Sequence, residues 1–261
     1  MFPVLLEFGP LRLFGYGAAI ALGGVLTFRV MWLRRARIGL KDDESYWALL
    51  NGLLLSGFGG GHLLYLAEYA RPGTPEFRQY ALSLSAGYSV FGGFIGASLF
   101  VVLFARWKKI PVLRLADTVF WCALFAHVFG RLGCFLAGCC YGRPTSLPWG
   151  ITFHDPRAML PPSLLGVPLH PTQLYEAVGN ALFAAALWRV LRASDEGRLA
   201  PGLVVAGHFA AYGAMRFALE PLRGDTLPLA GALTVGQGLG LGLLAASGAV
   251  LVWRRRCTPS C

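Results

Sequence analysis

The chain has 261 residues, of which 56% are hydrophobic and only 14% are charged, and its mean hydropathy is +0.57. Soluble domains usually carry about 25% charged residues, so this composition excludes an ordinary soluble enzyme, a disordered chain and a coiled coil. The net charge of +10 indicates the basic loops that orient a membrane protein rather than nucleic-acid binding.

Seven apolar segments are long enough to be membrane-spanning helices, which need about 20 residues each. Each segment is apolar on nearly all sides, which excludes amphipathic surface helices. In chain order we expect them at about residues 13–33, 46–68, 88–106, 115–135, 172–192, 200–219 and 232–253. We therefore predict an all-α polytopic membrane protein that forms a single membrane domain over residues 1–261.

Basic residues predict the orientation of these helices. Most of the 23 Lys and Arg residues, including every Lys, follow the first, third, fifth and seventh segments. Because Lys and Arg are enriched in cytoplasmic loops, we place the N-terminus outside and the C-terminus in the cytoplasm. The first ten residues lack a basic region, so we expect no cleaved signal peptide and a retained first helix.

The longest connection, residues 136–171, contains seven prolines and cannot be a single helix. The orientation places it on the extracytoplasmic side. A connection of this length is more often functional than passive, although a solvated connector is the alternative.

Two arginines lie inside apolar segments, where a charged side chain is costly and suggests a function. Arg131 and Arg216 are each 16 residues from the start of their segment, or about 24 Å from the inner face. His62 falls at a similar depth, and Tyr16 lies near the outer end of the first segment. Two guanidinium groups at one level repel each other unless an anion lies between them, and Arg binds phosphate through paired donors. We expect that anion to be a phospholipid head group.

A stripe of polar side chains follows one helical face in residues 200–219 and beyond, because its members are four residues apart. They are His208, Tyr212, Arg216 and Glu220. His127 lies one turn before Arg131 in the same way. An ion pair between Arg216 and Glu220 that only ties helices together is the structural alternative.

Several glycines lie near the outer ends of the apolar segments. Gly92 and Gly93 begin the third segment near its outer end, and Gly142 follows Arg131 along the chain. Small residues allow close helix packing, and they equally leave room for a bulky lipid beside the backbone.

Three of the six cysteines are clustered, namely Cys134, Cys139 and Cys140. This C-x₄-C-C pattern occurs once, whereas zinc sites usually show two pairs, so we expect no metal. A disulfide from Cys134 to one of the other two is an alternative in an oxidising compartment. We favour small buried thiols that pack against glycine.

The chain resembles the prolipoprotein diacylglyceryl transferase family over nearly its whole length. The matching segments are Gly15–Gly17, Gly92–Gly96, Gly130–Gly133, His170–Glu176 and Tyr212–Phe217, followed by Glu220 and Arg223.

This resemblance implies a multi-pass enzyme of the bacterial inner (cytoplasmic) membrane that uses no cofactor and has no nucleic-acid partner. Phosphatidylglycerol would donate its diacylglyceryl group to the lipobox cysteine thiol of a prolipoprotein and form a thioether, with glycerol phosphate as the leaving group. Arg131 and Arg216 would hold the phosphate and stabilise the leaving group as catalytic residues. Residues expected to bind or orient substrate are Tyr16, His62, Gly92, Gly93, Gly142, Tyr212 and Glu220.

The chain departs from the family where the acceptor thiol is activated. Phe91 stands where the family has a His, and Cys134 and Cys139 stand where it has Asn and Glu. His62 and His127 are candidate replacements for the base, because imidazole titrates near neutral pH. The alternatives are a non-catalytic phospholipid-binding membrane protein and a thiol redox membrane protein built on the cysteines.

Overall fold

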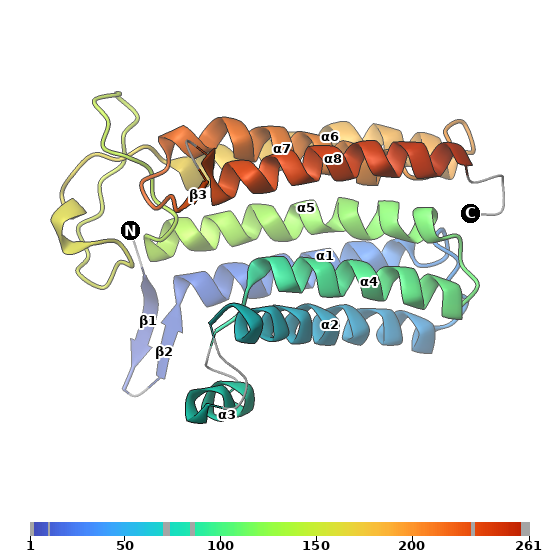
Figure 1. The fold of residues 1–261 in the computed structure, drawn as a ribbon, viewed down its shortest axis with the longest axis horizontal. Coiled ribbons are helices and arrows are strands. Elements are labelled where there is room, and N and C mark those ends of the chain that lie inside the picture. The colour runs from blue at the N-terminus through green and yellow to red at the C-terminus, as the bar shows by residue number, and fades with distance from the viewer. Residues whose placement is uncertain (1–2, 10, 70–73, 84–86, 231–232, 257–261) are drawn as a thin grey trace. The chain divides into compact units, whose positions relative to one another are not determined.

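The computed structural model describes residues 3–9, 11–69, 74–83, 87–230 and 233–256. Within these residues, each of the seven predicted segments is a long helix (Figure 1). The helices are α1 (Gly15–Arg34), α2 (Asp43–Tyr69), α4 (Val90–Trp107), α5 (Val112–Ala137), α6 (Thr172–Asp195), α7 (Leu203–Leu219) and α8 (Val235–Arg256). The prediction of a helical protein is therefore confirmed.

The shorter elements were not predicted. They are the strands β1 (Val4–Phe8), β2 (Leu11–Phe14), β3 (Pro228–Ala230) and β4 (Leu233–Thr234), the helix α3 (Pro75–Leu82), and the 3₁₀ turns η1 (Pro162–Leu164) and η2 (Glu220–Leu222). β1 pairs with β2 and β3 with β4, both antiparallel. Thr74 starts α3 as its N-cap, because its hydroxyl accepts a 3.2 Å hydrogen bond from the backbone N–H of Phe77.

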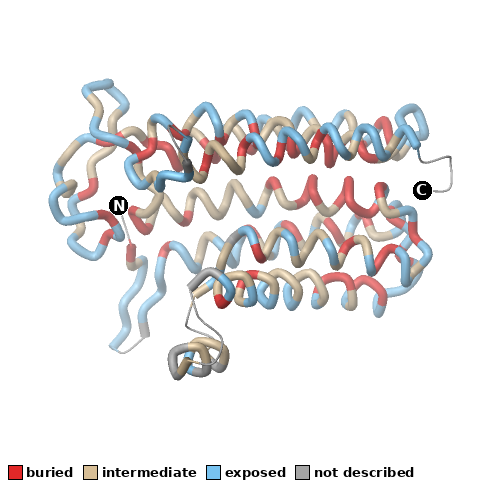
Figure 2. Tube along the Cα trace, in the orientation of Figure 1, coloured by how far each residue is buried: buried red, intermediate tan, exposed pale blue. Residues whose placement is uncertain are grey.

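Four of the described helices, α1, α2, α5 and α8, are long and apolar enough to cross a membrane. The described part of α4 is a shorter apolar helix, Phe91–Trp107. Many large apolar residues of α1 and α8 are exposed, which is expected of helices in lipid and unusual in water. Figure 2 marks exposed residues along the chain in pale blue. The chain is thus a helical membrane protein, while the count of seven spans and the orientation stay predictions.

The described contacts divide the chain into two compact units. Among the described residues, those up to Met31 and those from Asp117 to Arg256 form one unit, and those within Trp32–Ala116 form the other. The boundaries fall within α1 and α5, so each of these helices contributes to both units.

In the unit Trp32–Ala116, α2 and α4 lie side by side. Their backbones meet at Gly60 and Gly92, where a Cβ on either residue would overlap the carbonyl oxygen of the other. Gly93 lies close to the carbonyl of Gly57 in the same way. Close helix packing therefore explains why these residues are glycines, and lipid binding by Gly92 and Gly93 stays a prediction.

In the other unit, α7 packs against both α6 and α8. Gly213 and Gly240 allow α7 and α8 to approach, since a Cβ on either would lie 2.7 Å from the carbonyl oxygen of the other. Trp121 ties α5 to α6 through a 2.9 Å hydrogen bond from its indole N–H to the carbonyl of Ala184. These contacts bring the polar faces of α5, α6 and α7 to one place.

The connection from α5 to α6 is folded around a small core of its own. Phe153, Ala158, Leu160 and Leu169 are buried together. Leu169 also pairs its backbone with those of Pro144 and Ile151. As predicted, the stretch is not a single helix, and its first two residues complete α5. It is an ordered structure rather than a loose connector.

A buried carboxylate aligns α5 with α7. Asp117 accepts hydrogen bonds from the backbone N–H groups of Gly202 (2.7 Å) and Val205 (3.0 Å) at the start of α7. Fourteen residues then separate Asp117 from Arg131 on α5, and fourteen separate Gly202 from Arg216 on α7. Since both helices rise by about 1.5 Å per residue, this anchor keeps the two arginines level.

We predict that Asp117→Ala lowers the free energy of unfolding by about 1–2 kcal/mol, the cost of a lost helix cap. Asp117→Asn should lose less, because its amide oxygen can still accept one of the two hydrogen bonds. Thermal or denaturant unfolding in detergent micelles measures both variants. An unchanged Asp117→Ala midpoint would contradict the proposed anchor.

Candidate functional site

A single carboxylate joins three arginines from different parts of the chain. Glu176 is completely buried near the start of α6. Its Oε2 lies 2.8 Å from Nη2 of Arg131, and its Oε1 lies 3.4 Å from Nη1 of Arg216 and 3.0 Å from Nη1 of Arg223. The structure therefore brings Arg131 of α5 and Arg216 of α7 together, and adds Arg223, which follows η2.

Glu176 supplies the anion that two facing guanidinium groups require. The sequence predicts such an anion between Arg131 and Arg216 but assigns it to a lipid phosphate. Glu176 lies in the His170–Glu176 motif, yet its part in the site was missed. The signal that could have found it is an acidic residue inside an apolar segment, since such residues usually pair with a buried cation.

Two further carboxylates complete the charge balance. Nη2 of Arg216 lies 2.8 Å from Oε2 of Glu220, and Nη2 of Arg223 lies 2.8 Å from Oδ2 of Asp225. The hydroxyl of Thr234 donates a 2.9 Å hydrogen bond to Oε1 of Glu220. The ion pair between Arg216 and Glu220 is thus present, but as one part of a larger network.

Arg131 is the most accessible of the three arginines. Its side chain is 19% exposed, compared with 11% for Arg216 and 9% for Arg223. Within the described part of the chain, Glu176 is its one ion-pair partner. A guanidinium group has five N–H donors, so Arg131 can engage a second anion while it holds Glu176.

Tyr16 lies near the end of α5 that carries Arg131. The residue is 45% exposed at the start of α1, and its ring approaches the space that a side chain on Gly133 would fill. Gly133 is two residues from Arg131 on α5, so the phenol lies beside the arginine-bearing end of that helix.

Aromatic rings extend from the arginines along the interior of the unit. The ring of His127 lies 5.1 Å from that of Tyr212 and 5.7 Å from that of His208. Nδ1 of His208 is 3.0 Å from the carbonyl oxygen of Phe120. His208, Tyr212 and Arg216 lie on one face of α7, as their four-residue spacing predicts, and His127 of α5 packs against the first two.

The His170–Glu176 motif also holds the segment that follows α5. The hydroxyl of Thr172 donates to the carbonyl of Cys140 (2.9 Å), and the amide of Gln173 donates to the carbonyl of Cys139 (2.8 Å).

Gly142 lies in the same segment, and its backbone pairs with that of Arg223. The backbone of His170 occupies the space that a side chain on Gly142 would need. Gly142 therefore contributes by allowing this close backbone packing.

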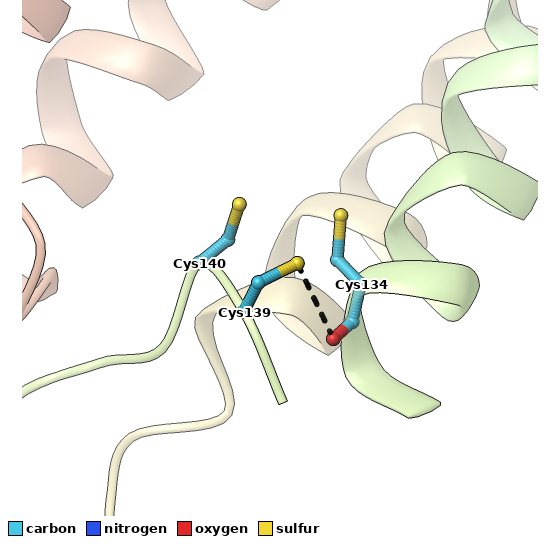
Figure 3. Close-up of side chains that lie close together, drawn as sticks. All are labelled: Cys134, Cys139 and Cys140. Atoms are coloured by element: carbon cyan, nitrogen blue, oxygen red, sulfur yellow. Dashed lines mark hydrogen bonds between the residues drawn. The ribbon is translucent and has the colours of Figure 1, made fainter. Parts of the chain in front are cut away.

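The three clustered cysteines adjoin the arginines. The sulfur atoms of Cys134, Cys139 and Cys140 all lie within 4.8 Å of one another, and the three thiols are free (Figure 3). The thiol of Cys139 donates a 3.8 Å hydrogen bond to the carbonyl oxygen of Cys134. The neighbouring thiols of Cys134 and Cys139 lower the pKa of Cys140 below its ordinary value. The charges of Arg131 and Arg223 lower the pKa of Cys140 further, while burial opposes both effects.

The remaining predicted residues lie in the unit Trp32–Ala116. Nε2 of His62 is 3.4 Å from the carbonyl oxygen of Ala81, and its ring lies 5.6 Å from that of Tyr88. Phe91 is 37% exposed at the start of α4, next to Gly92 and Gly93.

We predict that Glu176→Ala lowers the free energy of unfolding by about 3–5 kcal/mol, because it leaves buried guanidinium groups without their shared carboxylate. Glu196→Ala is the matched control, since Glu196 pairs with Arg198 at an exposed site. Such surface pairs are worth about 0–1 kcal/mol. Unfolding in detergent micelles measures both, and equal losses would contradict the central role of Glu176.

Comparison with known proteins gives a match over almost the whole chain. The sequence model of a family described as prolipoprotein diacylglyceryl transferase matches residues 3–253. A phosphatidylglycerol-prolipoprotein diacylglyceryl transferase of Clostridium tetani is 36% identical over 228 residues, which cover 86% of this chain and 86% of the relative. Proteins of the same name from Geobacter sulfurreducens (36% identical, 98% and 97% covered) and Nostoc sp. (32% identical, 98% and 92% covered) match at greater length.

Proposed function

Because this chain belongs to the prolipoprotein diacylglyceryl transferase family, we propose that it transfers the diacylglyceryl group of phosphatidylglycerol to the lipobox cysteine of prolipoproteins. The observation that carries this proposal is the meeting of Arg131 and Arg216 at the buried carboxylate of Glu176. Ionisable residues inside apolar helices mark a functional site, and guanidinium groups bind phosphate through paired donors. The phosphate of phosphatidylglycerol is such a group.

In this reaction, the acceptor sulfur attacks the glyceryl carbon that carries the phosphate. A C–S bond forms, the C–O bond breaks, and its electron pair leaves on glycerol phosphate. Arg131 and Arg216 hold the phosphate and offset the charge that develops on the leaving oxygen. Arg216 is held on both sides by Glu176 and Glu220, so its guanidinium group is oriented before the lipid arrives.

The other predicted site residues have supporting roles in this proposal. Tyr16 offers an exposed phenol to the head group, Glu220 positions Arg216, and Tyr212 lies on the same helix face as Arg216. Gly142 holds the backbone of Arg223. His62, Gly92 and Gly93 remain proposed substrate contacts.

We also propose the placement of the site in the membrane. All seven long helices span the bilayer, with the N-terminus outside and residues 136–171 on the extracytoplasmic side. This orientation places Arg131 and Arg216 at the outer leaflet of the bacterial inner membrane. The distribution of Lys and Arg supports it.

A second candidate function is phospholipid binding without transfer. Phe91, Cys134 and Cys139 favour it, because they replace the residues with which the family is expected to activate the acceptor thiol. Release of glycerol phosphate in the presence of a lipobox peptide separates the two functions, since a binding protein retains the lipid intact.

We predict that Arg131→Ala and Arg216→Ala each lower the rate of transfer at least about 100-fold, the usual cost of removing one donor that stabilises developing charge. The assay follows a labelled phosphatidylglycerol onto a lipobox peptide in proteoliposomes. Arg198→Ala is the control, because Arg198 pairs only with Glu196 in an exposed turn among the described residues. Full activity of either site variant would contradict the proposed phosphate site.

A further inference from the structure

Three thiols that have no role in the proposed transfer lie close together beside the arginines. Cys134 lies in the last turn of α5, and Cys139 and Cys140 lie just beyond that helix. Their sulfur atoms lie within 4.8 Å of one another, and that of Cys139 lies 3.8 Å from the carbonyl oxygen of Cys134 (Figure 3). Thiolates bound to one zinc ion at 2.3 Å stand roughly 3.8 Å apart in a tetrahedral site. A small inward movement of the three side chains would therefore form three ligands.

The turn after α5 brings Cys139 and Cys140 back beside the end of that helix, where Cys134 lies. Gly138 (φ +77°) and Cys140 (φ +58°) both have left-handed backbone conformations, which is uncommon for a residue other than glycine. The carbonyl of Cys134 accepts hydrogen bonds from the backbone N–H groups of Gly138 (2.9 Å) and Cys139 (3.2 Å). Together with the hydrogen bonds from Thr172 and Gln173, these contacts hold the thiols in place.

The charges around the thiols suit a metal-thiolate group. Three thiolates and one Zn²⁺ carry a net charge of −1 in total. Arg131 lies one turn before Cys134 on α5, and the backbone of Arg223 pairs with that of Gly142, two residues after Cys140, so two cationic residues flank the segment that would carry that charge.

The chemistry of the proposed transfer requires a thiolate from the acceptor. Two of the three cysteines, Cys134 and Cys139, replace the Asn and Glu expected from the family, and Phe91 replaces the expected base. Zinc sites with three protein ligands keep a fourth position open. A thiol that coordinates zinc is deprotonated outright.

We propose that Cys134, Cys139 and Cys140 bind a zinc ion whose fourth position takes the acceptor thiol as a thiolate. This proposal rests on the proposed transfer and supplies its missing activation step. The S–H bond of the acceptor breaks, and its proton passes to water. The sulfur then forms the C–S bond while glycerol phosphate leaves with the electrons of the C–O bond. Zinc suits this step because the transfer neither oxidises nor reduces any group.

The first experiment measures metal binding without reference to activity. Purified, reduced protein in nanodiscs is stripped of metal and titrated with Co²⁺, and the thiolate-to-metal absorption band is recorded. We expect one metal ion per chain, displaced by Zn²⁺, and loss of the band in the Cys134→Ser/Cys139→Ser/Cys140→Ser variant. Cys122→Ala is the control, since Cys122 is buried elsewhere in α5 and should leave the band unchanged.

The second experiment measures transfer by the same samples. Metal-free protein and the triple Ser variant should transfer at least about 100-fold more slowly than zinc-loaded protein, the lower end of what a positioned base contributes. Zinc should restore the metal-free protein and not the variant. Cys140→His, which supplies another zinc ligand, should still bind one Co²⁺ per chain, with a weaker thiolate-to-metal band because two thiolates remain.

The outcomes separate this proposal from the proposed function. Transfer that is unaffected by metal removal and by the triple variant would overturn the zinc proposal and leave the transferase intact. Zinc binding without transfer in any sample would overturn the proposed function. A disulfide in the protein as isolated, binding of Cu⁺ but not Zn²⁺, or a triple variant that fails to bind phosphatidylglycerol although it folds would each overturn the zinc site.

Discussion

The site depends on one buried carboxylate that holds several cations. Glu176 is fully enclosed and contacts Arg131 of α5, Arg216 of α7 and Arg223, which follows α7 and η2. A buried ion pair contributes little net stability, but the loss of one partner is costly. The network therefore acts as a constraint: α5, α6 and the end of α7 can pack only in the arrangement that pairs these charges.

This constraint also prepares the site for a lipid phosphate. The guanidinium groups of Arg216 and Arg223 are each held by two carboxylates, whereas Arg131 is the most exposed and has one such partner among the described residues. Preorganised donors cost little reorganisation when charge develops on a leaving group. The charges of the network already balance, so an arriving phosphate adds a negative charge. Arg131 is best placed to bind this phosphate, because it is the most exposed of the three arginines.

Much of this arrangement follows from the sequence, and the remainder depends on tertiary contacts. Apolar segments predict all seven long helices, and helix rise predicts that Arg131 and Arg216 lie at one depth. Sequence spacing does not predict Glu176 as their shared partner, because it lies 45 residues from Arg131 and 40 from Arg216 along the chain. Sequence spacing also does not predict the hydrogen bonds by which Thr172 and Gln173 fix the backbone of Cys139 and Cys140. The helix α3 and the two hairpins are too short to give a periodic signal.

A structure of the protein in a bilayer with phosphatidylglycerol tests the central claim most directly. The account predicts that the lipid phosphate lies within hydrogen-bond distance of Arg131 and Arg216 while Glu176 still contacts both. A phosphate bound elsewhere, with the two arginines paired only with protein carboxylates, would contradict it.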